Sequence, residues 1–284
     1  MRIIATSDWH GNLPDLPPAD LLLLVGDILP DFEGSKDWRV IKQEKWFKER
    51  AVPHCQKIAR ETVAVWGNHD FYGYYEEQRE FGNKGGKVTI LQDSGTLVFD
   101  EEDHNLVPLY IYGMPWVKNL PSWAFSLDEN RMREKCAKIP ASTDILISHG
   151  PPLYWGDQLG SSGKYGSRWD GEHVGWYELR AWLEMPQITE RSPITICGHI
   201  HEAFGHYRDR LVNNVSYVDE DYTPKERWLE LEYDKEGLRV SGFGYQGGGG
   251  EVAAVAEPNT GAGGGADDVD HGVGSEVEAA ESRI

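Results

Sequence analysis

Short apolar or β-branched runs recur along the chain, and each has the length of a single buried strand. Five of them predict buried strands at residues 3–6, 21–25, 62–66, 144–147 and 194–197. Further runs predict strands at residues 87–91, 96–99 and 109–112. Residues 228–233 and 238–243 alternate around a turn that contains Gly237, which predicts a hairpin.

Between the strands, apolar residues recur at helical spacing. They predict amphipathic helices over residues 38–49, 127–138 and 174–184. Pro53 interrupts the first pattern, after which a second helical piece reaches residue 60. Strands alternate with helices early in the chain and cluster as hairpins later. This order favours an α+β fold, an α/β sandwich in which two packed mixed β-sheets are flanked by α-helices.

The composition changes sharply after Gln246, where a run of four glycines begins. Residues 247–284 contain no aromatic side chain, eight acidic residues and one basic residue, so they hold −7 of the net charge of −19. Such a segment buries too little apolar surface to offset its conformational entropy. We therefore expect a catalytic domain over residues 1–246 and a disordered Gly/Ala/acidic tail over residues 247–284.

The charge balance narrows the class of partners. Lys plus Arg total 28 and Asp plus Glu total 47, whereas proteins that coat nucleic acid or anionic membranes carry a basic face. The three cysteines form no CxxC pair, which argues against a disulfide framework or a zinc ribbon. The first residues lack the apolar length of a signal peptide, and no apolar run approaches a membrane span. We expect a cytoplasmic protein without long nucleic acid or membrane partners.

The five buried strands end in the same way, with Asp, Asn or His close behind the strand and usually a glycine beside it. The segments are Asp8-Trp9-His10, Gly26-Asp27, Gly67-Asn68-His69-Asp70, Ser148-His149-Gly150 and Gly198-His199-Ile200-His201. A strand end is a rigid frame for a ligand, and glycine lets the backbone turn sharply beside a crowded site. One such segment is usually structural, but five of them point to a single functional site.

The side chains in these segments are oxygen and imidazole donors, with no thiolate among them. Seven are candidate metal ligands: Asp8, His10, Asp27, Asn68, His149, His199 and His201. Neutral imidazole together with carboxylate suits Mn, Fe, Zn, Co or Ni rather than Ca. Seven donors exceed the needs of one ion and fit two divalent metal ions that share a carboxylate, the usual clamp for in-line displacement at phosphorus. The sequence favours a binuclear metal-dependent phosphohydrolase, with Mn as the first choice of metal.

These blocks, in this order, resemble the calcineurin-like metallophosphoesterase superfamily. The motifs of that family run Asp-x-His, Gly-Asp, Gly-Asn-His-Asp/Glu, His after an apolar strand, and Gly-His-x-His. The resemblance covers residues 1–201, and residues 148–152 and 198–205 are similar to the small metallophosphoesterase-domain-containing proteins. It implies the two-sheet fold and a hydrolase that acts on phosphoester bonds.

The resemblance also implies a role for each ligand. The first ion would be held by Asp8, His10, Asp27 and His201. Asp27 would bridge the two ions, and Asn68, His149 and His199 would complete the second site. His69 would be the catalytic residue that faces the substrate, where it helps the leaving oxygen to accept a proton or stabilises charge on phosphorus. Asn68 and His69 would both contact the substrate.

Two departures from the family pattern bear on the substrate and on His69. The protein Ser/Thr phosphatases of the superfamily carry arginines after Gly-Asp and before Gly-Asn-His, where this chain has residues 28–32 and Trp66. Because a guanidinium fork is the usual way to hold a dianionic monoester, its absence favours a phosphodiesterase on small, nucleotide-like esters. Asp31 stands one residue beyond the His-orienting Asp of the family, so Asp31, Asp70 or neither could orient His69.

Further substrate contacts and functions stay open. Arg168, in a glycine-rich stretch between two ligand blocks, is a candidate for the missing phosphate contact. Aromatic residues that could stack on a nucleobase follow the His69 block, although such residues more often belong to the core or rim; they are Phe71, Tyr72, Tyr74 and Tyr75. The alternatives to a phosphodiesterase are a phosphoprotein or small-molecule phosphomonoesterase and a metal- or nucleotide-binding module with little turnover. No oligomeric state is predicted.

Overall fold

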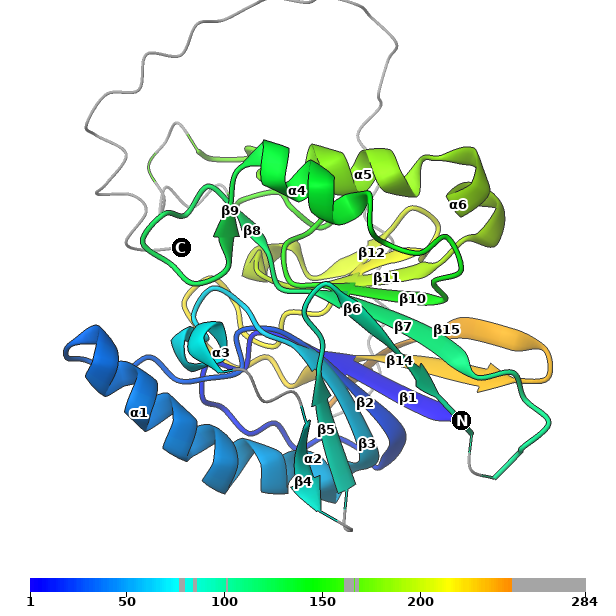
Figure 1. Cartoon of the computed structure of the whole chain (residues 1–284), viewed down its shortest axis with the longest axis horizontal. Coiled ribbons are helices and arrows are strands. Elements are labelled where there is room, and N and C mark those ends of the chain that lie inside the picture. The colour runs from blue at the N-terminus through cyan, green and yellow to red at the C-terminus, as the bar shows by residue number, and fades with distance from the viewer. Residues whose placement is uncertain (77–79, 84–85, 101, 161–165, 167–168, 247–284) are drawn as a thin grey trace, which may run out of the picture.

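Two β-sheets face each other at the centre of the molecule (Figure 1). The computed structural model describes residues 1–246, apart from 77–79, 84–85, 101, 161–165 and 167–168. The first sheet has the strand order β15-β14-β1-β2-β3-β5-β4, and the second has the order β12-β13-β11-β10-β7-β6. Both contain parallel and antiparallel pairs, so both are mixed sheets.

The strands coincide largely with the apolar runs of the sequence. The first sheet contains β1 (Arg2–Thr6), β2 (Ala19–Val25), β3 (Ala59–Val65), β4 (Glu80–Asn83), β5 (Gly86–Ile90), β14 (Arg227–Asp234) and β15 (Gly237–Tyr245). The second contains β6 (Ser94–Val98), β7 (Leu109–Met114), β10 (Ile145–Ser148), β11 (Ile194–Cys197), β12 (Gly205–Tyr207) and β13 (Val212–Asn214). A separate two-stranded pair is formed by β8 (Val117–Lys118) and β9 (Ser126–Leu127).

The central strands are buried on both faces. One face of each strand points into the space between the sheets, where side chains such as Leu23 and Val63 share a core with Ile147 and Ile196. The opposite face, which includes Leu22, belongs to a second core that contains helical side chains. Burial on both faces explains why these strands read as continuous apolar runs rather than as alternating patterns.

Helices cover the outer faces of the two sheets, which confirms the predicted α+β sandwich (Figure 1). The helical segments are α1 (Lys36–Trp46), η1 (Phe47–Ala51), α2 (Val52–Ile58), α3 (Phe71–Tyr75), α4 (Glu129–Cys136), α5 (Tyr177–Leu183), α6 (Pro186–Arg191) and η2 (His201–Ala203). In Figure 1, α1 and α2 lie below the first sheet, and α4, α5 and α6 lie above the second.

Local structure differs from the sequence prediction at several helix ends. The helix expected over residues 174–184 spans Tyr177–Leu183, and the piece expected to reach residue 60 ends at Ile58. Pro53 does not interrupt the first helix, because it lies in the first turn of α2, where a backbone N–H is not required, and a π-helical turn joins α1 to α2. The helix expected from residue 127 begins at Glu129, since the Asp128 side chain caps it by accepting a hydrogen bond from the Arg131 backbone N–H. Leu127 instead lies in β9.

The topology brings five strand ends to one edge of the sandwich. Strands β1, β2 and β3 are parallel neighbours in the first sheet, and β10 and β11 are parallel neighbours in the second. Hydrogen bonds join the segments that follow these strands across the two sheets, including one from the His199 backbone N–H to the Asp8 carboxylate. The donor residues of the sequence therefore meet at this edge. The predicted acidic tail lies outside the described residues.

Candidate metal centre

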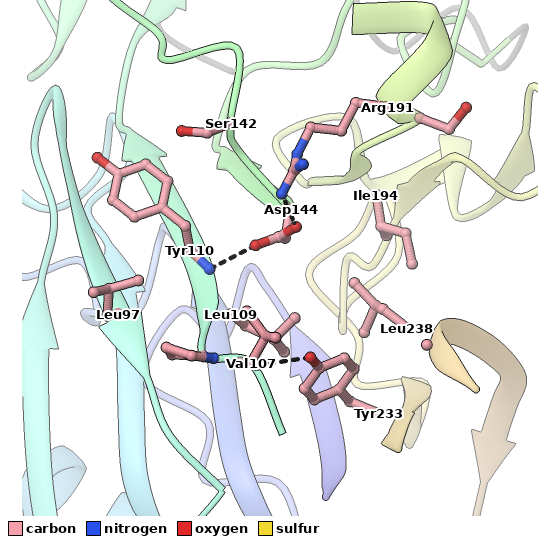
Figure 2. Close-up of a pocket in the computed structure, with 13 residues that line it drawn as sticks. Leu97, Val107, Leu109, Tyr110, Ser142, Asp144, Arg191, Ile194, Tyr233 and Leu238 are labelled. Atoms are coloured by element: carbon pink, nitrogen blue, oxygen red, sulfur yellow. Dashed lines mark hydrogen bonds and ion pairs between the residues drawn. The ribbon is translucent and has the colours of Figure 1, made fainter. Parts of the chain in front are cut away.

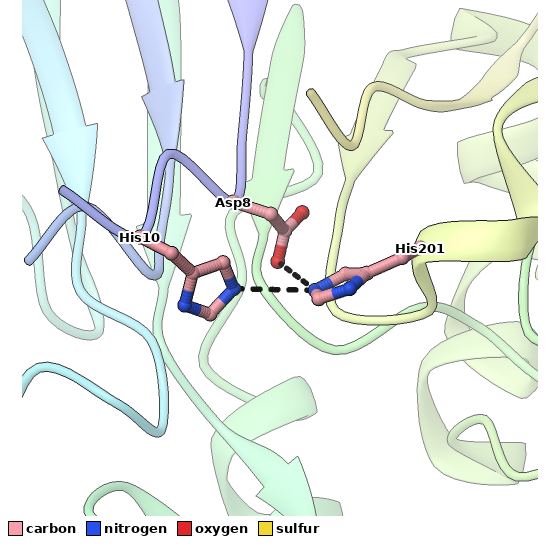
Figure 3. A group of neighbouring side chains, drawn as sticks. All are labelled: Asp8, His10 and His201. Atoms are coloured by element: carbon pink, nitrogen blue, oxygen red, sulfur yellow. Dashed lines mark hydrogen bonds and ion pairs between the residues drawn. The ribbon is translucent and has the colours of Figure 1, made fainter. Parts of the chain in front are cut away.

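The first group of donor atoms comes from both sheets. Asp8 and His10 follow β1, and His201 opens η2 directly beyond β11. The Nε2 atoms of His10 and His201 lie 3.2 Å apart, and the His201 Nε2 atom lies 3.4 Å from the Asp8 Oδ1 atom. Figure 3 shows the three side chains converging on a common point between the strand ends. This is the geometry of ligands around one cation.

A second group lies beside the first. One donor atom each from Asp27, His149 and His199 lies within 4.8 Å of the others. The His149 Nε2 atom is 3.2 Å from the Asp27 Oδ2 atom and 3.1 Å from the Asn68 Oδ1 atom. The structure thus brings together all seven residues that the sequence nominated as ligands.

Asp27 lies between the two groups. Its Oδ1 atom accepts a hydrogen bond from the His69 backbone N–H at 2.8 Å. Its Oδ2 atom is left facing His149 of the second group at 3.2 Å and His10 of the first at 3.9 Å. A carboxylate in this position can be shared by two ions.

Four of these residues occupy the left-handed backbone region, which non-glycine residues seldom adopt. The φ angles are 55° at Asp8, 44° at His10, 48° at Asp27 and 70° at His199. Each such residue costs about 1 kcal/mol or more and persists only where the surrounding fold holds it in place. Left-handed backbone thus aims four of the seven candidate ligands into this edge of the sandwich.

Glycines in the same segments make room for the donor atoms. A Cβ atom on Gly67 would lie 2.2 Å from the Asp27 Oδ1 atom and 2.6 Å from the His149 Nε2 atom. A Cβ atom on Gly198 would lie 1.9 Å from the Ser7 Oγ atom. The glycines beside the ligands are therefore required by close packing of backbone against donor groups.

The electrostatics of the cluster suit a cation. Burial alone would raise the pKa of the Asp8 carboxyl, but the neighbouring His201 holds it well below its usual range. Burial lowers the pKa of both His10 and His199 to about 3, so these imidazoles are neutral and able to coordinate. Burial alone would lower the His149 pKa, but the Asp27 carboxylate raises it to about 9.

The residues present fit a pair of divalent ions. In the described part of the chain, the ion pairs of Asp8 and Asp27 are made with histidines rather than with lysine or arginine. The buried His10 Nδ1 atom has no hydrogen-bond partner among the described residues. Buried carboxylates surrounded by imidazole and amide donors call for a compensating positive charge, and such donors suit Mn, Fe, Zn, Co or Ni.

His69 lies next to this cluster, with its ring centroid 4.7 Å from that of His10. Its Nδ1 atom donates a hydrogen bond to the Asp31 Oδ2 atom at 2.7 Å. Burial alone would lower the His69 pKa, but the Asp27 and Asp31 carboxylates raise it. Of the two aspartates that the sequence left open, Asp31 therefore contacts His69.

Asp70 connects two loops rather than contacting the His69 ring. Its carboxylate accepts hydrogen bonds from the backbone N–H groups of Gly67 and Leu29, both at 2.8 Å, and of Ile28 at 3.3 Å. It ties the β3 loop to the β2 loop and so fixes the spacing of Asn68 and Asp27.

Two aromatic residues that sequence reasoning missed also lie at the site. The Trp123 ring centroid is 4.2 Å from that of His69, and the Tyr222 centroid is 4.7 Å from that of His10. Both come from irregular loops, and no motif in the sequence marks them. Their positions depend entirely on how the loops pack.

The other residues that the sequence suggested as substrate contacts lie in the core, on the surface or outside the described residues. Arg168 lies outside the described residues. Phe71 and Tyr72 are buried in the core, 3% and 4% exposed, and cannot stack on a ligand. Tyr74 and Tyr75 are exposed, and their rings contact each other, Phe125 and the Lys36 ammonium group.

A separate hollow of about 550 Å³ lies at the amino ends of β7, β10 and β11, away from the metal centre. Figure 2 shows Asp144 within it, bonded to the backbone N–H of Tyr110 and paired with Arg191. Asp144 and Arg191 thus neutralise each other, and the residues that line this hollow include no cluster of histidines and carboxylates like the one at the strand ends.

No helix within the described ranges combines the length and apolar character needed to cross a membrane.

The sequence of this chain matches a known protein family. The family model described as calcineurin-like phosphoesterase matches residues 1–203. Human metallophosphoesterase domain-containing protein 1 is 26% identical over 238 residues, which cover 78% of this chain and 68% of that protein. A UPF0046 protein from Caenorhabditis elegans is 25% identical over 233 residues, covering 72% of this chain and 52% of its own length.

A probable rhamnogalacturonate lyase C from Emericella nidulans is 26% identical over 211 residues, covering 72% of this chain. The match spans 17% of the lyase, so the chain corresponds to a small part of that protein and to about half of the C. elegans relative. The family match at residues 1–203 contains all seven candidate ligands and His69. This chain belongs to the calcineurin-like phosphoesterase family.

Proposed function

We propose that this protein is a binuclear metal-dependent phosphohydrolase that cleaves phosphodiesters of small, nucleotide-like molecules. The observation that carries the proposal is the pair of donor groups with Asp27 between them, beside the hydrogen-bonded pair of His69 and Asp31. Membership of the phosphoesterase family supports the reaction class. We favour Mn as the bound metal and the cytoplasm as the compartment in which the protein acts.

The ligand set divides between the two ions as the family resemblance implies. The first ion is held by Asp8, His10, Asp27 and His201, and the second by Asp27, Asn68, His149 and His199. Divalent ions bound there supply Lewis acidity toward the phosphoryl oxygens and an ionised water for attack on phosphorus. The role of the chain is to fix that pair of charges at a rigid strand edge.

His69 acts on the leaving oxygen of the substrate as a proton donor. Its Nδ1 atom donates to Asp31, which fixes the ring and leaves Nε2 for the substrate. Because nearby carboxylates raise its pKa, His69 is suited to carry the proton that the leaving oxygen needs. Asn68 contacts the substrate phosphoryl group from the second metal site.

The protein interior argues for a diester. Trp66 is fully buried in the core, and position 31 carries a half-exposed carboxylate, so neither position presents a guanidinium group to phosphate. Arg227 is committed elsewhere, since it donates to the backbone carbonyls of Ser216, Val218 and His201. A monoanionic diester needs less positive charge than a dianionic monoester.

The charge of the chain argues for a small substrate. Two dications with two aspartates and one hydroxide leave the centre near +1, which attracts phosphate at close range. The whole chain carries −19, and this charge opposes the approach of long polyanions.

Metal analysis and activity assays on protein purified without chelators test the proposal. With Mn added, it should cleave bis(p-nitrophenyl) phosphate faster than p-nitrophenyl phosphate or a phosphopeptide, and His69→Ala should lose most of that activity while retaining its metal. Faster turnover of the phosphopeptide would favour a phosphoprotein phosphatase. Equal activity of wild type and His69→Ala toward every ester would favour a binding module.

A further inference from the structure

Two aromatic side chains from distant loops border the metal centre beside His69 and His10. Trp123 lies against His69, with ring centroids 4.2 Å apart. Tyr222 lies against three histidines at once, 4.7 Å from His10, 5.1 Å from His201 and 6.1 Å from His69. His69 is thus contacted by both rings, and both rings are partly exposed.

The loop that carries Trp123 is fastened to the metal centre. The Trp123 backbone N–H donates to the Leu120 carbonyl at 2.9 Å, and the next residue, Ala124, donates to the carbonyl of the ligand Asn68 at 3.1 Å. The Trp123 ring also stacks on Phe71, with centroids 6.0 Å apart and an interplanar angle of 29°. These contacts hold the indole beside His69.

Tyr222 is held in a strained conformation. Its φ angle is 60°, a left-handed value that is uncommon for a bulky aromatic residue. The turn is stabilised by Asp219, whose side chain accepts from the backbone N–H groups of Asp221 and Thr223 at 3.0 and 2.9 Å, and whose carbonyl accepts from Tyr222. Backbone strain of this kind clusters at ligand-binding sites.

The same turn is joined to a candidate metal ligand. The His201 Nδ1 atom donates to the Asp219 carbonyl at 3.1 Å, while Arg227 donates to the carbonyls of His201 and Val218. The placement of Tyr222 is therefore coupled to the placement of His201. A turn built around Asp219 presents one aromatic ring to the metal centre.

Resting on the function proposed above, we propose that Trp123 and Tyr222 form a subsite for a planar aromatic group carried by the phosphoester on its leaving side. Aromatic rings bind other planar rings by stacking and edge contacts, and they do so without charge. The substrate class that fits is an aryl or nucleoside ester of phosphate rather than an ester whose alcohol carries no aromatic ring. The two rings supply affinity at a centre whose core positions offer no arginine.

Binding of two uncleavable ligands tests this subsite. The full chain loaded with Mn should bind phenylphosphonate about tenfold more tightly than methylphosphonate in calorimetry. Trp123→Leu and Tyr222→Leu should each reduce this affinity ratio by about threefold, whereas Tyr222→Phe should retain it. Tyr75→Leu removes an exposed ring whose described contacts are with Tyr74 and Lys36 rather than with a histidine; it is the matched control and should keep the wild-type ratio. Elemental analysis verifies that each variant holds its metal.

Two outcomes would overturn the subsite: a wild-type ratio near one, or leucine variants that weaken both ligands by the same factor. If a leucine variant fails to fold or to hold metal, Trp123→Phe replaces it, and its smaller ring must lower the ratio. The proposed hydrolase activity is judged separately. A preference for phenylphosphonate without turnover of any ester refutes hydrolysis alone, and turnover with a ratio of one refutes the subsite alone.

Discussion

The Nδ1 atom of His69 lies 2.7 Å from the Oδ2 atom of Asp31 and donates a hydrogen bond to it. The two residues come from loops that follow neighbouring parallel strands, β3 and β2. Asp31 has a half-exposed side chain, whereas His69 is buried, so the carboxylate reaches the imidazole from the solvent side. This contact fixes which nitrogen of His69 faces the metal centre.

Replacing Asp31 tests that contact. Asp31→Asn keeps the size of the side chain but removes the charge that favours protonated His69, so kcat toward a phosphodiester should fall about 10- to 100-fold. Metal content and Tm should stay close to wild type because Asp31 is half-exposed and is not one of the seven candidate ligands. Steady-state kinetics with elemental analysis measures both. Wild-type kcat in Asp31→Asn would contradict the role of this pair.

Asp70→Asn is the comparison variant for Asp31→Asn. It turns an acceptor of three backbone N–H groups into a partial donor, which should cost about 1–3 kcal/mol of folding free energy. Thermal unfolding should therefore separate the two aspartates, with Asp70→Asn lowering Tm.

Asp27→Asn should remove most of the metal and most of the activity, since an amide cannot supply the charge that two ions share. Elemental analysis of the purified variant measures the loss. Asp157→Asn provides a control, because Asp157 is equally buried but pairs with His173 outside both donor groups. Two ions per chain in Asp27→Asn would refute Asp27 as the bridge.

Gly67→Ala should disrupt the metal centre without a charge change. The added methyl group would lie 2.2 Å from the Asp27 Oδ1 atom and 2.6 Å from the His149 Nε2 atom, so both must move. We expect metal content to fall by at least half. Gly160→Ala serves as the control because the nearest atom to its Cβ would be a flexible glutamate oxygen at 3.2 Å. Full metal content in Gly67→Ala would show that the donor positions tolerate displacement.

Removal of metal should lower thermal stability. Each ion that binds only the folded state adds about 2.7 kcal/mol when free metal is 100 times its Kd. For a domain of this size that corresponds to a rise in Tm of about 5–10 °C. Calorimetric scans of chelated and Mn-loaded protein measure it, and Asp27→Asn should show a smaller rise. An unchanged Tm on loading wild type would contradict metal binding.

Removal of residues 247–284 should leave activity and Tm unchanged. The first sheet is complete at Tyr245, and Gln246 makes the last described contacts, to the carbonyls of Glu226 and Asp15. Comparing the chain that ends at Gln246 with the full chain tests the predicted boundary. A clear drop in either quantity would show that the acidic segment contributes to the folded domain.

The strands and the ligand segments were predictable because both depend on local pattern. An apolar run that is buried on two faces has little choice but to form a central strand, and a polar residue behind it must lie at the sheet edge. The helices were less well bounded, since caps such as Ser35 and Asp128 and the π-helical turn before Pro53 decide where each begins. The short strands β12 and β13 lack a distinctive pattern and were not predicted.

The sequence by itself determined the sandwich of two sheets, the acidic character of the chain and the seven candidate donor residues that meet at one edge. Tertiary structure alone decided that Asp31 rather than Asp70 contacts His69, and that Trp123 and Tyr222 border the centre. The physical reason is that periodicity fixes which side chains share a face or an edge. Which loop side chains touch depends instead on turns, left-handed backbone angles and hydrogen bonds between segments far apart in the chain.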